Sequence, residues 1–216
     1  CGRYLNGYQT GRVTHSGDTL MGVTVGSVTH DQPHDDHAPV GHRSPFSRVG
    51  PGPNLIVKPD MVHIGGNAGA SIEARAVDAG VPILTPAGTI DTAIGTSFST
   101  PRVAALAAGL TQSMDDDFSP LMVRALMIHS SHYDRSLTLA PHERLAELGY
   151  GRPRSVEEVL YNSPHESTLV LADRIEKGGY FDMFDFPFPD DLTDDYGYFR
   201  GEIIATLVLY LYIFIT

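Results

Sequence analysis

A serine just ahead of an apolar helix is the residue of this sequence best suited to covalent chemistry. Ser97 follows Gly95, and a helix is expected from Pro101, where Val103 and Leu110 repeat with helical spacing. Glycine allows a sharp turn, and the free N–H groups of a helix N-terminus would stabilise the oxyanion formed when a hydroxyl attacks a carbonyl. Serine and threonine are also preferred helix caps, so the hydroxyls here could be purely structural. Helix physics alone leaves both interpretations open.

Histidines are the other candidates for a base or a metal ligand. Four of the ten lie close together, at His30, His34, His37 and His42, with three aspartates among them. Imidazole and carboxylate groups at this spacing could surround Zn²⁺ or a similar ion. The stretch also lies between predicted strands, where a polar surface loop is expected, and no cysteine is close. We therefore predict a solvated loop with no metal and no cofactor, and keep a metal-binding module as an alternative.

Other polar residues carry weaker signals. His15 and His63 have no Asp or Ser pattern near them, so we expect both to be structural. His129 and His132 lie near a predicted helix end, where the helix dipole favours a positive charge. Asp115-Asp116-Asp117 lacks the alternating oxygen ligands of a calcium loop and is predicted to be a solvated turn.

The elements that must position these residues alternate between strands and helices, which is typical of an α/β domain. Small apolar residues at 21–28 predict a strand buried on both faces, as in a parallel sheet covered by helices. Shorter strands are expected at 55–57, ended by Lys58-Pro59-Asp60, and at 81–84. Residues 68–79 fit either a short helix or a loop.

Three helices are expected. The first begins near Pro101, and its small residues Ala104, Ala105 and Ala108 suit a helix packed deep in a domain. The second begins at Pro120 behind a Ser119 cap and ends near His129, and the third begins at the capping box Ser155-Val156-Glu157-Glu158.

The pattern changes after Pro164, which we predict to be a domain boundary. Residues 168–171, 180–188 and 196–208 suggest strands, and Phe181, Phe184, Phe186 and Phe188 suggest the core of a β-sandwich. We therefore expect an α/β domain over residues 1–162 and the start of a β-rich domain over residues 163–216.

Composition excludes several classes of protein. The chain has 216 residues, 42% of them hydrophobic and 19% charged, which is too apolar for a disordered chain. A net charge of −11 without a basic stripe argues against a nucleic-acid partner, and one cysteine excludes a disulfide scaffold. The longest apolar run, residues 203–215, is shorter than the roughly 20 residues of a membrane span. The compartment stays open, with a lean towards the cytoplasm.

The order of residues around Ser97 carries a family resemblance. Gly95-Thr96-Ser97-Phe98-Ser99-Thr100-Pro101, followed by Val103-Ala104, resembles the serine motif of the subtilisin-like serine peptidases (peptidase family S8). Further stretches resemble other parts of that domain in the same order, and the resemblance extends to about residue 162. They are Gly22 to Val28, Pro45 to Pro51, Lys58-Pro59-Asp60, Val123 to Leu126 and Gly149 to Pro153.

This resemblance implies a three-layer, subtilisin-like α/β domain with a mostly parallel sheet. It also implies a serine-type endopeptidase that acts on peptides or proteins through an acyl-enzyme on Ser97, with a histidine as base and an aspartate that orients it. No metal or cofactor is implied. The segment from Thr89 to Ile94 would form a wall of the specificity pocket.

The sequence departs from the family pattern in its first half. Neither Asp-[Ser/Thr]-Gly nor His-Gly-Thr, the family contexts of the triad Asp and His, occurs in residues 1–216. We expect these residues, and the oxyanion-hole Asn, upstream of Cys1, because both ends of the chain resemble cuts; Asn6 is the nearest candidate for the Asn. The chain would then need the missing N-terminal half of its own catalytic domain to hydrolyse peptides. The alternative is a non-catalytic pseudoprotease that acts as a binding or regulatory module.

Overall fold

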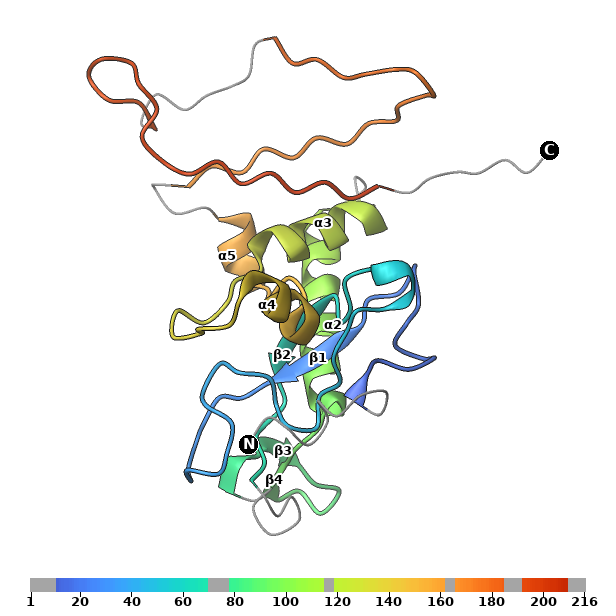
Figure 1. The fold of residues 1–216 in the computed structure, drawn as a ribbon, viewed down its shortest axis with the longest axis vertical. Coiled ribbons are helices and arrows are strands. Elements are labelled where there is room, and N and C mark those ends of the chain that lie inside the picture. The colour runs from blue at the N-terminus through green and yellow to red at the C-terminus, as the bar shows by residue number, and fades with distance from the viewer. Residues whose placement is uncertain (1–10, 70–77, 115–118, 162–165, 185–191, 210–216) are drawn as a thin grey trace, which may run out of the picture.

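The computed structural model describes residues 11–69, 78–114, 119–161, 166–184 and 192–209. The described residues up to 161 form a packed body, and those from 166 onwards run in an extended path across one end of the body (Figure 1).

The centre of the body is a pair of parallel strands. β1 (Val25–Val28) pairs with β2 (Met61–Ile64), with Val25 opposite Met61 in the register. Alternate side chains of a strand point to opposite faces, so Met61 and Val62 enter two different hydrophobic clusters. The strand predicted at 21–28 is confirmed over its second half.

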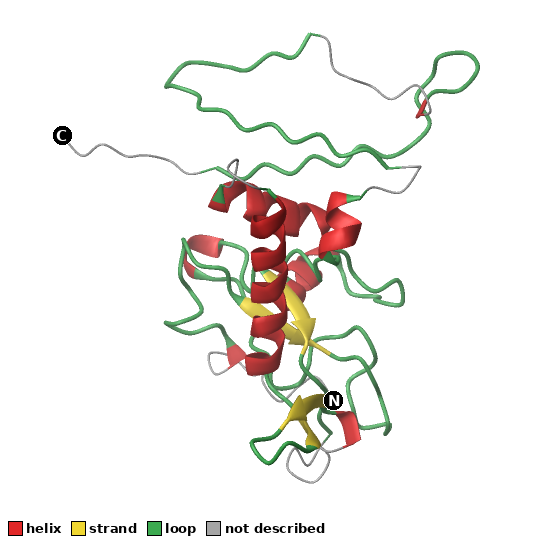
Figure 2. Ribbon diagram, turned by 180° about the vertical axis from the view of Figure 1, so that it is seen from behind, coloured by secondary structure: helices red, strands yellow, loops and turns green. Residues whose placement is uncertain are grey.

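Helices cover one face of this pair. α2 (Thr96–Ser113), α3 (Pro120–Ser130) and α5 (Val156–Leu160) lie on the side of Met61, and α2 crosses in front of the strands in Figure 2. The larger cluster joins Met61 to side chains of α2 and α3, namely Val103, Leu110, Val123, Leu126 and Met127. The three predicted helices are therefore present, and the capping box of α5 is confirmed: Ser155 Oγ accepts from the Glu158 N–H at 3.3 Å.

A fourth helix, which sequence reasoning did not predict, covers the other face. α4 (Pro141–Leu148) brings Leu148 against Val28 and Val62. Gly149 ends the helix with φ +58°, and a Cβ there would lie 2.1 Å from the carbonyl oxygen of Pro59. The chain thus passes from α4 back across β2 so closely that only glycine fits. Helices, sheet and helix form the three layers expected of this fold class.

A small hairpin lies beyond the N-terminal end of α2 (Figure 1). β3 (Val81–Leu84) pairs antiparallel with β4 (Ile90–Ala93), with Val81 opposite Ala93. β3 confirms the strand predicted at 81–84. β4 occupies most of the segment from Thr89 to Ile94, which we predict to form a wall of the specificity pocket.

Three local expectations are wrong. Residues 53–55 form the 3₁₀ turn η2 (Pro53–Leu55) instead of a strand at 55–57, and Lys58-Pro59-Asp60 precedes a strand instead of ending one. α2 begins at Thr96, so Pro101 lies inside the helix and not in its first turn. Ala104, Ala105 and Ala108 are exposed, because the described part of the chain packs on only one face of α2.

The extended segment after residue 165 does not confirm the predicted β-rich domain. Its described residues contain no named strand, and their only pairing is an isolated bridge between Thr193 and Phe199. Phe184 is 91% exposed and Phe181 is 49% exposed, whereas a sandwich core would bury both. Phe186 and Phe188 lie outside the described residues.

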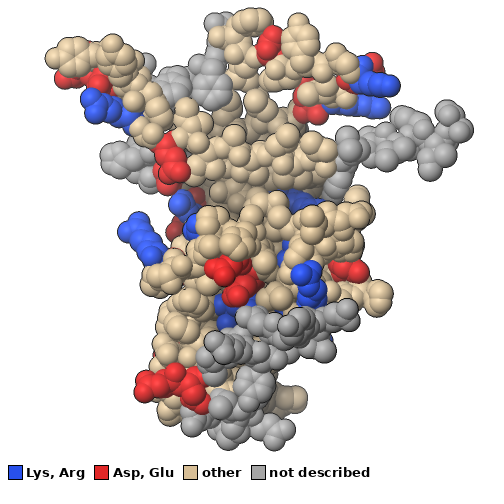
Figure 3. All heavy atoms as spheres, in the orientation of Figure 1, with Lys and Arg blue, Asp and Glu red and all other residues tan. Residues whose placement is uncertain are grey.

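Two expectations from the composition concern a basic surface stripe and a membrane-spanning helix. On the face shown in Figure 3, Lys and Arg side chains occur among Asp and Glu and do not form a continuous basic stripe. No helix in the described ranges has the length and apolar character needed to cross a membrane.

Candidate active site

Gly95 sets the geometry at the start of α2. It is the N-cap residue, with φ +149° and ψ 157°, a backbone conformation that side chains disfavour. Its N–H donates to the Gly65 carbonyl at 2.9 Å, which ties the start of the helix to the loop that follows β2. Ser97 is therefore the second residue of α2, where backbone N–H groups lack helical partners and the helix dipole is positive.

The hydroxyl groups of this turn differ in their surroundings. Ser97 is exposed, whereas Ser99 is fully buried and its Oγ has no hydrogen-bond partner within the described residues. Thr100 Oγ1 donates to the Thr96 carbonyl at 2.9 Å. No side chain among the described residues caps the start of α2, so these hydroxyls do not act as helix caps. Thr100 is exposed as well, but its hydroxyl is used within the helix, so Ser97 Oγ is the exposed hydroxyl of the turn that has no hydrogen bond to a described residue.

The floor beneath the turn is built from small residues. A Cβ on Gly65 would lie 2.4 Å from both Ser27 Oγ and Ser99 Oγ, so the Gly65 backbone lies directly against a hydroxyl of β1 and a hydroxyl of α2. Ser27 Oγ is 2.8 Å from Ser44 Oγ, and the Ser27 N–H donates to Ser47 Oγ at 2.9 Å. These buried hydroxyl contacts connect the 44–47 turn to β1 and hold the end of the sheet against α2.

A buried charge network fixes the start of both strands. Asp60 is 1% exposed and receives the Lys58 ammonium at 2.5 Å and the Arg124 guanidinium of α3 at 2.6 Å. Asp60 Oδ2, the oxygen that accepts from Lys58, also accepts from the Thr24 N–H at 2.7 Å. Two stretches singled out in the sequence, Lys58-Pro59-Asp60 and Val123 to Leu126, therefore meet in space. Their contacts join the start of β2 to α3 and to the residue that precedes β1.

The histidine loop is held by an asparagine that sequence reasoning missed. Asn67 is fully buried, and its side-chain N–H₂ donates at 2.7 Å to the carbonyls of both Asp31 and Ala38. His37 is also fully buried, 3.3 Å from the Asp36 carboxylate, so the loop is not solvated throughout as predicted. His34 pairs with Asp78 at 3.3 Å.

Metal ligation finds no support in these side chains. No group of three or more His, Cys, Asp or Glu residues that could hold a metal ion occurs in the described part of the chain.

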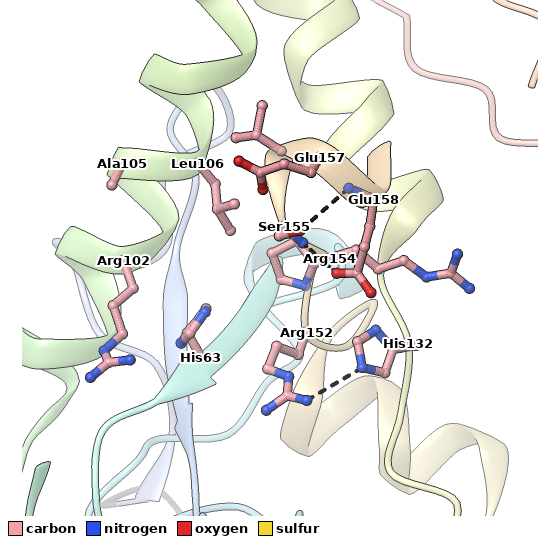
Figure 4. Close-up of a pocket in the computed structure, with 12 residues that line it drawn as sticks. His63, Arg102, Ala105, Leu106, His132, Arg152, Arg154, Ser155, Glu157 and Glu158 are labelled. Atoms are coloured by element: carbon pink, nitrogen blue, oxygen red, sulfur yellow. Dashed lines mark hydrogen bonds between the residues drawn. The ribbon is translucent and has the colours of Figure 1, made fainter. Parts of the chain in front are cut away.

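Two histidines line a hollow that sequence reasoning did not find. His63, expected to be structural, and His132 border a space of about 590 Å³ together with Arg102, Arg152 and Arg154 (Figure 4). Burial, together with the nearby positive charges of Arg102 and Arg152, lowers the pKa of His63 to about 4. Burial and the charge of Arg152 also lower the pKa of His132. Widely spaced sequence positions meet here, so no local pattern could reveal the hollow.

The described residues do not complete a triad around Ser97. No histidine or carboxylate among them is hydrogen-bonded to Ser97, and the Asp115-Asp116-Asp117 turn, Asn6 and Cys1 lie outside the described ranges. The structure thus presents a helix-borne serine, its supporting glycines and a rigid floor.

Comparison with known proteins assigns the family. The family model Peptidase_S8, described as the subtilase family, matches residues 6–151. This span covers more than half of the chain and contains the serine turn, both strands of the parallel pair and helices α2 to α4. The chain belongs to the subtilase family.

Two solved structures that resemble the chain are proteases by their titles. The CspB protease of Clostridium perfringens matches with 18% identity and a TM-score of 0.44, over 64% of this chain and 26% of that one. The epidermin leader peptide processing serine protease EpiP of Staphylococcus aureus matches with 20% identity and a TM-score of 0.49, over 70% and 33% of the two chains. The chain thus spans about a quarter to a third of the length of these structures. No curated protein matches it.

Proposed function

We propose that this chain is the part of a serine endopeptidase that carries the nucleophile, and that Ser97 is that nucleophile. The observation that supports the proposal best is the exposure of Ser97 in the first turn of α2, directly behind Gly95 at φ +149°, within the region that matches the subtilase family. An exposed hydroxyl that caps nothing, at the positive end of an 18-residue helix, is well placed to attack a carbonyl.

The reaction that this geometry suits is acyl transfer. Ser97 Oγ gives its proton to a histidine base and forms a bond to the carbonyl carbon of the substrate, and the carbonyl oxygen takes up the negative charge. Collapse of this intermediate breaks the C–N bond, and the histidine returns the proton to the leaving amine. Water then attacks the ester with the same base, which breaks the bond to Ser97 Oγ and restores the hydroxyl. Backbone N–H groups at the start of α2 would stabilise the oxyanion.

We also propose that the base, its aspartate and the oxyanion-hole Asn come from residues N-terminal to Cys1. The support is the sequence itself, because neither family context of the triad Asp and His occurs in residues 1–216. Residues 1–216 would then supply the nucleophile and its floor, and they would be inactive alone. The gene sequence upstream of Cys1 tests this point: an in-frame Asp-[Ser/Thr]-Gly and His-Gly-Thr support it, and a frame that begins near Cys1 contradicts it.

The activity test uses the full-length natural protein and a matched pair of serine variants. Ser97→Ala removes the proposed nucleophile, and Ser113→Ala removes an exposed serine at the other end of α2, whose Oγ only donates to the Gly109 carbonyl. We expect Ser97→Ala to lower the rate of casein hydrolysis by about 10⁴-fold or more and Ser113→Ala to leave it unchanged. A folded Ser97→Ala protein with normal activity would contradict the proposal.

The same experiment decides between the endopeptidase and a non-catalytic relative. A full-length protein that folds, carries the upstream Asp and His, and still hydrolyses no protein substrate would favour a pseudoprotease that serves as a binding or regulatory module. A circular dichroism spectrum of each variant keeps loss of fold apart from loss of chemistry.

A further inference from the structure

The hollow at the edge of β2 has the features of a ligand site separate from the serine turn. Among the described strands β2 is paired only with β1, and the hollow of about 590 Å³ opens beside its other edge. His63 of β2 forms one part of the lining, α2 contributes Arg102, and the segment that leads into α5 contributes Arg152. Ser97 does not line it.

Two arginines of this hollow lack an ion-pair partner among the described residues. Arg102 and Arg152 form no ion pair with any described residue, and the closest polar partner of Arg152 is His132 Nε2, 3.5 Å from its guanidinium. Arg154 differs from them, because its guanidinium lies 3.2 Å from the Glu166 carboxylate. Two unpaired guanidinium groups in one hollow are unexpected in a chain of net charge −11, and they attract an anion.

The ring of His63 adds a neutral donor between the two arginines (Figure 4). Its Nδ1 accepts a hydrogen bond from the Ile64 N–H at 2.8 Å, so the proton of the neutral ring is on Nε2. A pKa of about 4 keeps the ring neutral at pH 7. Nε2–H is therefore a hydrogen-bond donor that accompanies two fixed positive charges.

The rest of the lining limits what kind of anion fits. Ala105 and Leu106 of α2 and Val156 of α5 form an apolar wall. Glu157 and Glu158 lie at the α5 end, where Glu158 accepts from the Ser155 N–H at 3.0 Å and so stays with the helix cap. An acidic group would be repelled from that end and attracted to the arginine end, which gives the ligand one orientation.

We propose that this hollow binds a small organic anion, with its carboxylate or phosphate group between Arg102 and Arg152 over His63 and its apolar body against α2. Guanidinium groups pair with both kinds of oxyanion in the same way, so the charge chemistry is shared. The volume is in the range of small-molecule sites.

Calorimetric titration of the full-length natural protein with three matched probes tests this site. The probes are phenyl phosphate, 3-phenylpropionate and, as a neutral control, 3-phenylpropanol. We expect saturable binding of at least one anion with a Kd of about 0.1–1 mM at low salt, weakening as the ionic strength rises, and weaker binding of the alcohol by at least tenfold. The preferred anion distinguishes a phosphate from a carboxylate ligand. Absence of saturable anion binding, or equal binding of the alcohol, would overturn the proposal.

Arginine variants locate the binding. Arg102→Gln and Arg152→Gln should each weaken anion binding by about tenfold, since each removes one charge-assisted pair. Arg135→Gln, at an exposed arginine in the loop before α4, changes the net charge equally and should leave the affinity unchanged. Equal weakening in all three variants would show a general charge effect and contradict the site.

The pKa of the His63 ring is a further test, because it changes only if the anion binds beside the ring. NMR titration of its ring protons should show the pKa rise by about 1 or more when the bound anion adds a negative charge nearby. An unchanged His63 pKa at saturating anion would place the ligand elsewhere and overturn the proposed position.

Discussion

The described residues of the body (within 11–161) and of the extended segment (within 166–209) both include many apolar side chains, but only in the body are such side chains buried. Met61 is fully buried and Leu110 is 1% exposed, whereas Leu207 is 82% exposed and Tyr196 is 86% exposed. Apolar composition alone therefore does not produce a packed unit in this chain. The body also has glycines at which two segments of the chain come into close contact.

Glycines illustrate the difference between the two regions. In the body, a Cβ on Gly149 would lie 2.1 Å from the Pro59 oxygen, and one on Gly65 would contact Ser27 and Ser99 at 2.4 Å. In the extended segment, Gly178 and Gly197 have positive φ, but nothing lies within 4 Å of a Cβ at either position. Gly65 and Gly149 therefore serve packing, and Gly178 and Gly197 serve local turns. We propose on this basis that a domain boundary lies near residue 162.

The largest expected difference between the regions comes from a glycine pair. Gly149→Ala places a methyl group against backbone that cannot move without displacing β2, and we expect a loss of about 4 kcal/mol or more in unfolding free energy. Gly178→Ala strains a turn that touches nothing else, so the main unfolding transition should keep its midpoint. Urea unfolding followed by circular dichroism measures both. A normal midpoint for Gly149→Ala would refute the role of close packing here.

A charge pair gives the next largest effect. Asp60→Asn leaves Lys58 and Arg124 without their shared carboxylate in a buried site, and breaking such a pair costs about 3–5 kcal/mol. Asp194→Asn removes the 3.1 Å contact of Asp194 with Arg200 in the extended segment, and the transition of the body should not change. Equal urea midpoints for the two variants would show that the Asp60 network does not hold the strands.

Truncation of apolar side chains extends the comparison to packing. Leu110→Ala opens a cavity in the larger cluster and should cost about 3 kcal/mol. Ile204→Ala removes a side chain that is 62% exposed and should cost less than about 0.5 kcal/mol. A large loss for Ile204→Ala in the same chemical-denaturation assay would mean that the extended segment packs in solution, and it would break the comparison.

The smallest expected effect is a pH dependence that belongs to the body. Burial and two arginines lower the pKa of His63 to about 4 from an ordinary value near 6.5, so the unfolded chain binds more protons between these values. Stability should therefore rise with pH from 4 to 6.5 and be constant above that range as far as His63 is concerned. Solvent screening reduces this contribution to about 1 kcal/mol.

The variant His63→Gln isolates that contribution. Between pH 6.5 and pH 4 the unmodified chain should lose about 1 kcal/mol more than the variant, and above pH 6.5 the difference between them should be constant. Parallel pH profiles of the two proteins in thermal unfolding would contradict the assigned environment of His63.

The sequence predicted those helices whose formation depends on residues close to one another in the chain. The apolar spacing of α2, the proline at the start of α3 and the Ser155 capping box each act within a few residues, and all three helices are present. The order Gly95 to Pro101 also identified the family, which the match over residues 6–151 then showed. The prediction that Ser97 is the nucleophile rests on that resemblance and stays a proposal.

Features that depend on distant residues could not be read from the sequence. The hollow joins His63 to Arg102 and Arg152, which are 39 and 89 positions away in the chain. The strand predicted at 55–57 was misplaced because Lys58-Pro59-Asp60 resembles a strand end, whereas the buried Asp60 network makes it a strand start. The aromatic residues near 181–184 suggested a core, but no partner surface among the described residues covers them.

The most direct test of the central claim is to map where a fluorophosphonate reacts with the full-length protein. The account predicts a single adduct, found by peptide mass spectrometry on Ser97 and absent after denaturation before labelling. An adduct on another serine, or no adduct on a folded protein that carries the upstream Asp and His, would contradict it.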